Sequence, residues 1–251
     1  MSHRTAEEAK DEYIQVMGKP LGTVFHALYN DTVLLYAKWR EYVELYGTNQ
    51  SRVDRLNQAA PLFFWVVEDT LWKETLLHMT RLTDPQYSGS RDKSNLTLQQ
   101  LARRQPRRRK RSRDKSNLTL QQLPSLVDEK IKEKIKDLVD EAVRSTKFCR
   151  DWRNRLIAHS DLALATKPSA TPLKAASREK VKKALGAIAK VLDAVTVHYC
   201  DSTTAFDLTI RVGGAEKLLR IIDDGLRAES ERKTRMISGQ MRASDIERRD
   251  L

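Results

Sequence analysis

Apolar residues recur at three- and four-residue spacing along most of the chain, and this pattern predicts helices. Between residues 21 and 45 the repeat consists of Val24, Leu28, Leu35, Trp39 and Val43. Similar patterns predict further helices over residues 5–17, 51–83, 125–147, 148–164, 177–199 and 215–233. Because each helix has an apolar stripe to bury, we expect an all-α fold, a bundle of six or seven helices packed on one another.

Residues that stop or cap helices set the predicted boundaries. Gly18 and Pro20 end the first helix, and Asn49 or Ser51 caps the helix that runs to residue 83. Ser177 caps the helix over residues 177–199. Lysines crowd the first turns of that last helix, where the helix dipole does not favour positive charge.

Two segments have ambiguous patterns. Pro61 indicates a kink near the start of helix 51–83, and the segment PLFFWVV that it opens is apolar on every face. An all-round apolar helix is typical of a buried central position. Residues 203–212 alternate in polarity and predict either a short strand or an extended connection.

One segment is duplicated. SRDKSNLTLQQL occupies residues 90–101 and occurs again, letter for letter, at 112–123. A repeat that occurs only twice indicates a tandem duplication rather than a solenoid, and only one copy can occupy the native position. We therefore expect residues 86–124 to form an insertion loop with at most short helical turns. The surrounding chain, 1–233, is predicted to be a single domain, and 234–251 a charged, frayed tail.

The net charge of +12 comes mostly from this insertion. Residues 91–112 contain nine Lys or Arg and one Asp, a net +8, so the rest of the chain carries only +4. The insertion is either a tolerated passenger, which we favour, or an arm that contacts RNA.

Other classes of protein are disfavoured by composition. No stretch approaches the roughly 20 apolar residues of a membrane span, and the charged N-terminal segment does not resemble a secretory signal. The two cysteines, Cys149 and Cys200, form neither a disulfide framework nor a zinc pattern. Cys149 is either a reactive thiol or, as we favour, a small buried hydrophobe. We expect a cytoplasmic protein without a membrane partner.

The segment FCRDWRNRLIAHSD contains the residues most suggestive of chemistry: Arg153, Asn154 and His159. They match the signature that the HEPN superfamily uses, an arginine, a polar residue, four variable residues and a histidine. Upstream, FFWVVEDTLWKETLLHMTRLTDP followed by an NLTLQQL segment resembles the AbiU-type abortive-infection branch of that superfamily. Together the resemblance spans most of residues 20–225.

The resemblance implies a fold, an activity and partners. Proteins of this kind are HEPN-like helical bundles that cleave RNA without a metal or other cofactor, as homodimers whose two motifs face one cleft. They belong to phage-defence or toxin–antitoxin settings, so an antitoxin or regulator is a further expected partner. By this resemblance Arg153, Asn154 and His159 would be the catalytic residues.

The residue types suit RNA cleavage. A proton must leave the 2′-hydroxyl and another must reach the departing 5′-oxygen, and histidine, with an ordinary pKa near 6.5, can serve either step. Arginine offers planar donors and a permanent charge to the anionic transition state. Asn154 would orient His159 or donate to the phosphate. No carboxylate cluster suited to Mg²⁺ lies near the motif, so we expect no metal site.

Helical geometry adds weaker candidates. On a straight α-helix Arg153 and His159 point about 120° apart, whereas Arg155 is the i,i+4 neighbour of the histidine. Arg155 therefore remains a possible phosphate contact. Trp152 is a possible stacking surface for a base, although tryptophans at helical spacing more often lie in the core.

Arg81 is a further candidate for substrate contact, and its alternative role is an i,i+3 pair with Asp84. The rival functions also remain open. One is a non-catalytic HEPN-like module that binds RNA, a nucleotide or a protein. Another is a purely structural helical dimer, in which Arg153 is a surface charge and His159 caps a helix.

Overall fold

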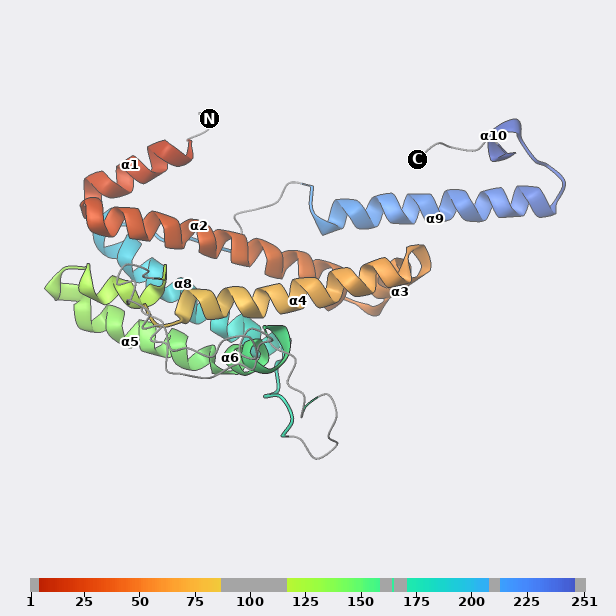
Figure 1. Ribbon diagram of the computed structural model, residues 1–251. Helices are drawn as coiled ribbons and strands as arrows, with labels where there is room; N and C mark the ends of the chain where they lie inside the picture. The colour runs from red at the N-terminus through yellow and green to blue at the C-terminus, as the bar shows by residue number, and fades with distance from the viewer. Residues whose placement is uncertain (1–4, 87–116, 159–163, 165–170, 208–212, 247–251) are drawn as a thin grey trace, which may run out of the picture. The chain divides into compact units, whose positions relative to one another are not determined.

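The computed structural model describes residues 5–86, 117–158, 164, 171–207 and 213–246 (Figure 1). Every regular element within these ranges is helical, which confirms the predicted all-α fold. The first half contains α1 (Ala6–Met17), α2 (Lys19–Tyr42), η1 (Val43–Gly47), α3 (Gln50–Ala59) and α4 (Pro61–Thr83). The second half contains η2 (Leu120–Ser125), α5 (Glu129–Ser145), α6 (Lys147–Trp152), η3 (Arg153–Ile157), α8 (Arg178–Cys200), α9 (Ala215–Ile237) and α10 (Ala243–Ile246). Here η1 and η3 are π-helical turns and η2 is a 3₁₀ turn.

Side-chain caps fix the helix starts. The Asn49 Oδ1 atom accepts from the Arg52 N–H at 3.0 Å, which selects Asn49 over Ser51 as the cap of α3. Ser177 Oγ accepts an N–H from the first turn of α8, as predicted. Thr5 and Glu8 form a reciprocal capping box at α1, a device that satisfies two otherwise unpaired backbone N–H groups. None of the described helices combines the length and apolar composition that a membrane span requires.

Pro61 breaks the predicted helix 51–83 rather than bending it. Ala60 takes a non-helical conformation, with φ −160° and ψ 79°, and α4 begins at Pro61 itself. Proline favours the first helical position because its missing N–H would have no partner there, so the chain ends α3 and starts a new helix.

The apolar start of α4 is not buried in the way the sequence predicted. Leu62, Phe63 and Trp65 are 73%, 60% and 63% exposed, and Val66 is also exposed, while Phe64 alone among these five lies in a core. The prediction of an all-round buried helix was therefore wrong for this turn. An apolar face of this kind on a water-exposed helix indicates an interaction surface.

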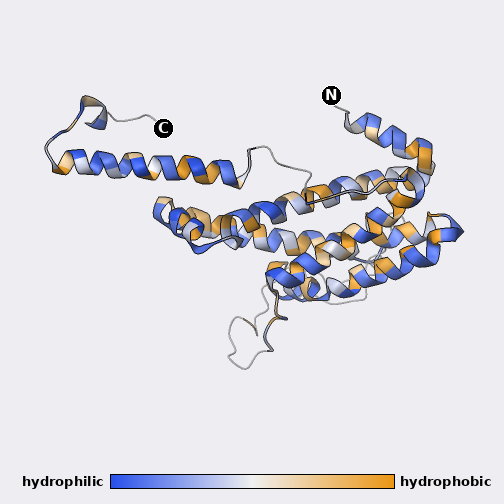
Figure 2. Ribbon diagram, turned by 180° about the vertical axis from the view of Figure 1, so that it is seen from behind, coloured by the Kyte–Doolittle hydropathy of each residue, from blue (hydrophilic) through white to orange (hydrophobic). Residues whose placement is uncertain are grey.

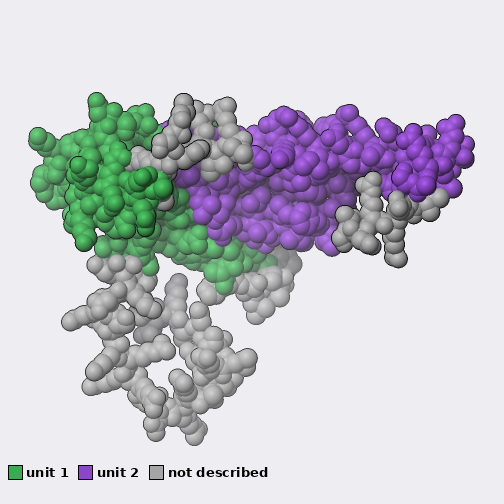
Figure 3. Space-filling model, turned by 90° about the horizontal axis from the view of Figure 1, so that it is seen from above, with its two compact units in different colours: residues 1–32, 77–204 green, residues 33–76, 205–251 purple. Residues whose placement is uncertain are grey.

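The chain divides into two compact units (Figure 3). Unit 1 comprises residues 1–32 and 77–204, and its core lies where α5 packs along α8. Both helices are amphipathic, with an apolar stripe and a charged opposite side (Figure 2). The buried stripes include Ile135, Val139, Ala142, Val181, Leu185, Ile188 and Leu192.

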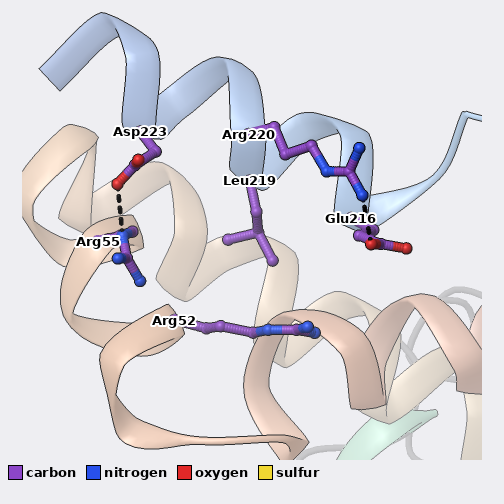
Figure 4. Close-up of a pocket in the computed structure, with 6 residues that line it drawn as sticks. All are labelled: Arg52, Arg55, Glu216, Leu219, Arg220 and Asp223. Atoms are coloured by element: carbon purple, nitrogen blue, oxygen red, sulfur yellow. Dashed lines mark hydrogen bonds and ion pairs between the residues drawn. The ribbon is translucent and has the colours of Figure 1, made fainter. Parts of the chain in front are cut away.

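Unit 2 comprises residues 33–76 and 205–251, with a core of Leu45, Leu56, Phe64, Ala215 and Leu219. Here α3 packs against α9 beside a small groove, and an ion pair of 2.7 Å joins Arg55 to Asp223 across it (Figure 4).

The Glu41 carboxylate lies close against the start of α9. The Ala215 N–H donates to Glu41 Oε2 at 2.6 Å, and a Cβ at Gly214 would lie 2.2 Å from the other carboxylate oxygen. The carboxylate thus caps α9, where negative charge stabilises a helix N-terminus.

Two further sequence predictions concern the C-terminal part. Residues 202–207 form no strand, and the rest of the segment 203–212 lies outside the described residues. In the expected tail, 234–251, α9 continues to Ile237 and α10 follows. Arg235 donates to both carboxylate oxygens of Asp245 at 2.9 and 2.7 Å, which holds the pKa of that carboxyl well below its usual range.

Candidate active site

The predicted motif begins on a π-helical turn. Helix α6 ends at Trp152 and continues as η3, and the Ala158 N–H donates to the Arg153 carbonyl, five residues earlier, at 2.8 Å. The predicted helix 148–164 is therefore not a straight α-helix over its described residues 148–158, and residues 159–163 lie outside the described part of the chain. The wider turn changes the angular spacing of side chains, so the 100° step of an α-helix does not apply here.

Arg153 is held in place by two neighbours. It forms an ion pair with Asp84 through Nη1, and its Nε donates to Asn154 Oδ1 at 3.0 Å. Its other terminal nitrogen, Nη2, has no acceptor within the part of the chain that the structure describes. The Arg153 side chain is 26% exposed. Its positive charge is therefore oriented by neighbours and partly accessible to solvent.

Asp84 lies just beyond the last residue of α4 and bridges two arginines. Its Oδ1 is 3.3 Å from Arg150 Nε, while Oδ2 pairs with Arg153. Arg150 also donates through Nη2 to the carbonyl of Thr83, at 2.5 Å, and so caps the C-terminus of α4. The end of α4 and the start of the motif are therefore fixed to each other.

The duplicated segment supplies the other contacts at this helix end. Thr119 Oγ1 lies 3.0 Å from the Leu82 carbonyl and 2.7 Å from that of Asp84, and Gln121 Nε2 donates to the Thr83 carbonyl at 2.9 Å. These bonds satisfy carbonyls that the helix leaves unpaired. They also give a physical basis for the RLTD and NLTL blocks on which the family resemblance depends.

The copy that docks is the second one. Residues 117–123 belong to it, and its Leu120 and Leu123 are fully buried. This copy alone runs directly into Pro124 and Val127 and then into α5. The first copy, 90–101, lies outside the described residues, as does most of the predicted loop 86–124.

The weaker candidates beside the motif are engaged with the segment 171–175. Arg155 donates to the carbonyl of Thr171 at 2.5 Å, and Trp152 Nε1 donates to the carbonyl of Lys174 at 2.8 Å. Asp151 Oδ2 accepts the Lys174 N–H at 2.8 Å. These side chains hold the segment that leads to α8 against the motif.

The remaining predicted residues are not brought into this cluster by any described contact. Arg81 lies exposed on the last turn of α4, and His159 lies outside the described residues. Cys149 is fully buried, and burial raises the pKa of its thiol to about 12, which agrees with the favoured prediction of a buried hydrophobe. No group of three or more potential metal ligands occurs among the described residues.

Sequence reasoning missed Arg150 and Thr119 as positioning residues. Arg150 is 66 residues from Asp84 and Thr119 is 35, so no local spacing connects them. The available signal was the threonine in the recurring NLTL block, whose side chain bonds the helix end.

Comparison with known proteins gives one match. Residues 18–218 match the family model HEPN_AbiU2, described as AbiU2. No curated protein and no solved structure matches the chain.

Proposed function

The chain belongs to the AbiU2 family of HEPN proteins, and from this membership we propose that it is a metal-independent RNA endonuclease. His159 acts as general acid or base, Arg153 stabilises the phosphate, and Asn154 orients the arginine. The observation that carries the proposal is the Arg153 side chain, which is positioned by Asp84 and Asn154 and retains a donor, Nη2, without an acceptor among the described residues.

The geometry of Arg153 supports a role in the transition state. A donor that is already oriented needs no reorganisation when negative charge develops on the phosphate, and such preorganised donors contribute strongly to rates. Asp84 also neutralises Arg150, so the carboxylate is shared and the pair of arginines keeps a net positive charge. A site with excess positive charge favours a phosphodiester.

Asn154 supports this arrangement through its carbonyl. Its Oδ1 accepts from Arg153 Nε, which by amide geometry leaves Nδ2 as a donor. The residue is exposed, so Nδ2 is available to a phosphate oxygen. The sequence left two roles open for Asn154, orienting His159 or donating to the phosphate. The contact with Arg153 supports a third role, orientation of the arginine, and leaves donation to the phosphate open.

We also propose that the protein acts as a homodimer in phage defence or as a toxin, under the control of an antitoxin or regulator. A dimer brings two motifs to one substrate, as the family resemblance implies. The exposed apolar residues Leu62, Phe63, Trp65 and Val66 of α4 are the surface that we assign to the second copy.

The test is cleavage of total tRNA and rRNA by purified protein in EDTA. We expect the wild type to cut and His159→Ala to be inactive with unchanged helicity. A matched control is His198→Gln, which changes a histidine of α8 that pairs with Asp128 at 3.4 Å. The control should retain activity.

Retained cleavage by His159→Ala would refute the catalytic assignment. If neither protein cuts but both bind RNA, the chain is a non-catalytic binding module, and the motif reflects ancestry. One observation fits that alternative as well. An arginine with no catalytic role would form the same ion pair with Asp84.

A further inference from the structure

A basic pocket lies in unit 1 where three helices approach one another. It has a volume of about 450 Å³ and is lined by the C-terminal end of α5, the start of α6, the segment before α8 and the first turns of α8. Five of its eight lining residues are cationic, and none is acidic: Arg144, Lys147, Lys174, Lys180 and Lys183. We call these five residues and the space between them the basic pocket.

The cations of the basic pocket are not neutralised by neighbours. Among the described residues none of the five forms an ion pair. One of their terminal groups donates a hydrogen bond to a described residue: Lys180 Nζ donates to the Ala175 carbonyl at 2.9 Å. Two lysines elsewhere on α5 do form ion pairs, Lys132 with Glu129 at 2.7 Å and Lys136 with Glu133 at 3.4 Å. What distinguishes the basic pocket is that five cations without a described ion pair line one space.

One of these lysines stands where it weakens its own helix. Lys180 lies in the first turn of α8. Positive charge is unfavourable at a helix N-terminus, whereas a bound anion there is stabilised by the helix dipole. An anionic ligand would reverse this cost.

The basic pocket is physically joined to the candidate active site. Helix α6 starts in the pocket at Lys147 and ends at Trp152, directly before Arg153, a rise of about 9 Å along the helix axis. The backbone of Lys174 is bonded to both Asp151 and Trp152. The pocket and Arg153 therefore lie at opposite ends of one short helix.

We infer that the basic pocket binds the phosphodiester backbone of the RNA next to the phosphate held by Arg153. The inference rests on the proposed function, which it extends to the site of substrate docking. Lysines and an arginine around an open space suit phosphates, which carry no sequence information. The only aromatic lining residue, Phe148, is 7% exposed and so offers no surface on which a base can stack.

The test compares two double variants for RNA binding in a full-length His159→Ala background, which prevents cleavage. Lys147→Ala with Lys183→Ala removes two charges from the pocket. Lys134→Ala with Lys190→Ala removes the same charge from exposed positions of α5 and α8 outside it. Fluorescence anisotropy with a single-stranded RNA of 20 nucleotides, from 50 to 300 mM KCl, measures affinity and its salt dependence.

We expect the pocket variant to bind on the order of tenfold more weakly, with a salt slope smaller by about 1.4, because each lost phosphate contact removes about 0.7 for a single strand. The control should change affinity less than about twofold. All four lysines are exposed, so helicity should be unchanged in both.

Equal affinities for the two double variants overturn the inference, as does failure of the background protein to bind RNA. Displacement of RNA by polyglutamate of equal charge at equal concentration also overturns it, since the pocket would then accept any polyanion. The proposed nuclease activity is judged separately, by wild-type cleavage. If the wild type does not cut while the pocket variant binds weakly, the activity fails and the docking site stands.

Discussion

Among the described residues, the two π-helical turns η1 and η3 share the same backbone irregularity, but their side chains have different surroundings. In η1, Leu45 is buried in the core of unit 2 and Tyr46 donates its hydroxyl to the Phe64 carbonyl at 2.8 Å. In η3, none of the five residues is buried, and the arginines meet polar partners. A widened turn can therefore serve packing or binding, and the exposure and polarity of its side chains indicate which.

The arginine attached to each turn shows the same contrast. Arg52, in the first turn of α3, donates to the Glu44 carbonyl at 2.7 Å and to its carboxylate at 2.5 Å, so it joins η1 to the helix that follows it. Arg153 belongs to η3 and is fixed to Asp84, at the end of another helix. We propose that only the second arrangement meets substrate, and the following changes test that difference.

The largest expected effect is on catalysis. Arg153→Ala should lower the rate of RNA cleavage about 10²–10³-fold, because it removes a preorganised donor from the transition state. Arg52→Ala, the matched change at the arginine that holds η1, should leave the rate within about threefold, since Arg52 pairs with Glu44 and has no described contact with the motif. Single-turnover cleavage in EDTA measures both. Equal losses in the two variants would remove the functional distinction between the turns.

The next effect is on stability and has the opposite pattern. Leu45→Ala should lower the free energy of unfolding by about 3 kcal/mol, because it leaves a cavity in the core of unit 2. Ile157→Ala, at one of the two partly buried apolar residues of η3, should cost about 1 kcal/mol. Urea unfolding followed by circular dichroism gives both values. A larger loss at Ile157 would mean that η3 also has a packing role.

Asp84→Asn tests whether η3 must be positioned. The substitution keeps the shape but removes the charge shared by Arg150 and Arg153, and we expect it to cost about 1–2 kcal/mol of stability. Cleavage should fall about tenfold at a temperature where the variant is fully folded, because Arg153 loses its orientation. Asp69→Asn, elsewhere on α4, is the control. Normal cleavage with reduced stability would limit Asp84 to a structural role.

The smallest effect concerns Tyr46 of η1 and depends on pH. Burial, together with the nearby charge of Glu68, raises the pKa of Tyr46 to about 12. The folded state therefore retains this proton above the ordinary pKa of 10, so the stabilisation is complete below pH 10 and is lost as the pH rises toward about 12. Tyr46→Phe should cost about 1 kcal/mol at pH 7 and show a weaker alkaline loss. An unchanged alkaline slope would contradict the assignment.

Much of the fold could be predicted because its signals are local. The caps at Asn49 and Ser177 and the helix break at Gly18 depend on residues within one turn of the boundary. Pro61 was recognised as a disturbance, but its neighbours do not reveal whether a helix bends or restarts. The prediction for the apolar turn 61–67 was wrong because a sequence that is apolar on every face does not distinguish a helix in a core from a helix with an exposed apolar surface.

The motif of the candidate site could be found in the sequence, but the contacts that hold the motif in place could not. Arg153 and Asn154 could be identified from spacing and family resemblance. Their π-helical turn could not, because a single widened turn depends on contacts rather than on propensity. The bridge from Asp84 to Arg150 and the basic pocket both join segments far apart in sequence, and only the folded chain brings them together.

The duplicated segment repeats in sequence the threonine that bonds the end of α4. Thr119 makes these bonds, and the identical first copy carries Thr97 at the equivalent position. If the first copy docked in place of the second, the connection to α5 would lengthen, and loop entropy penalises such lengthening only weakly. The entropic cost of exchanging one copy for the other is therefore small.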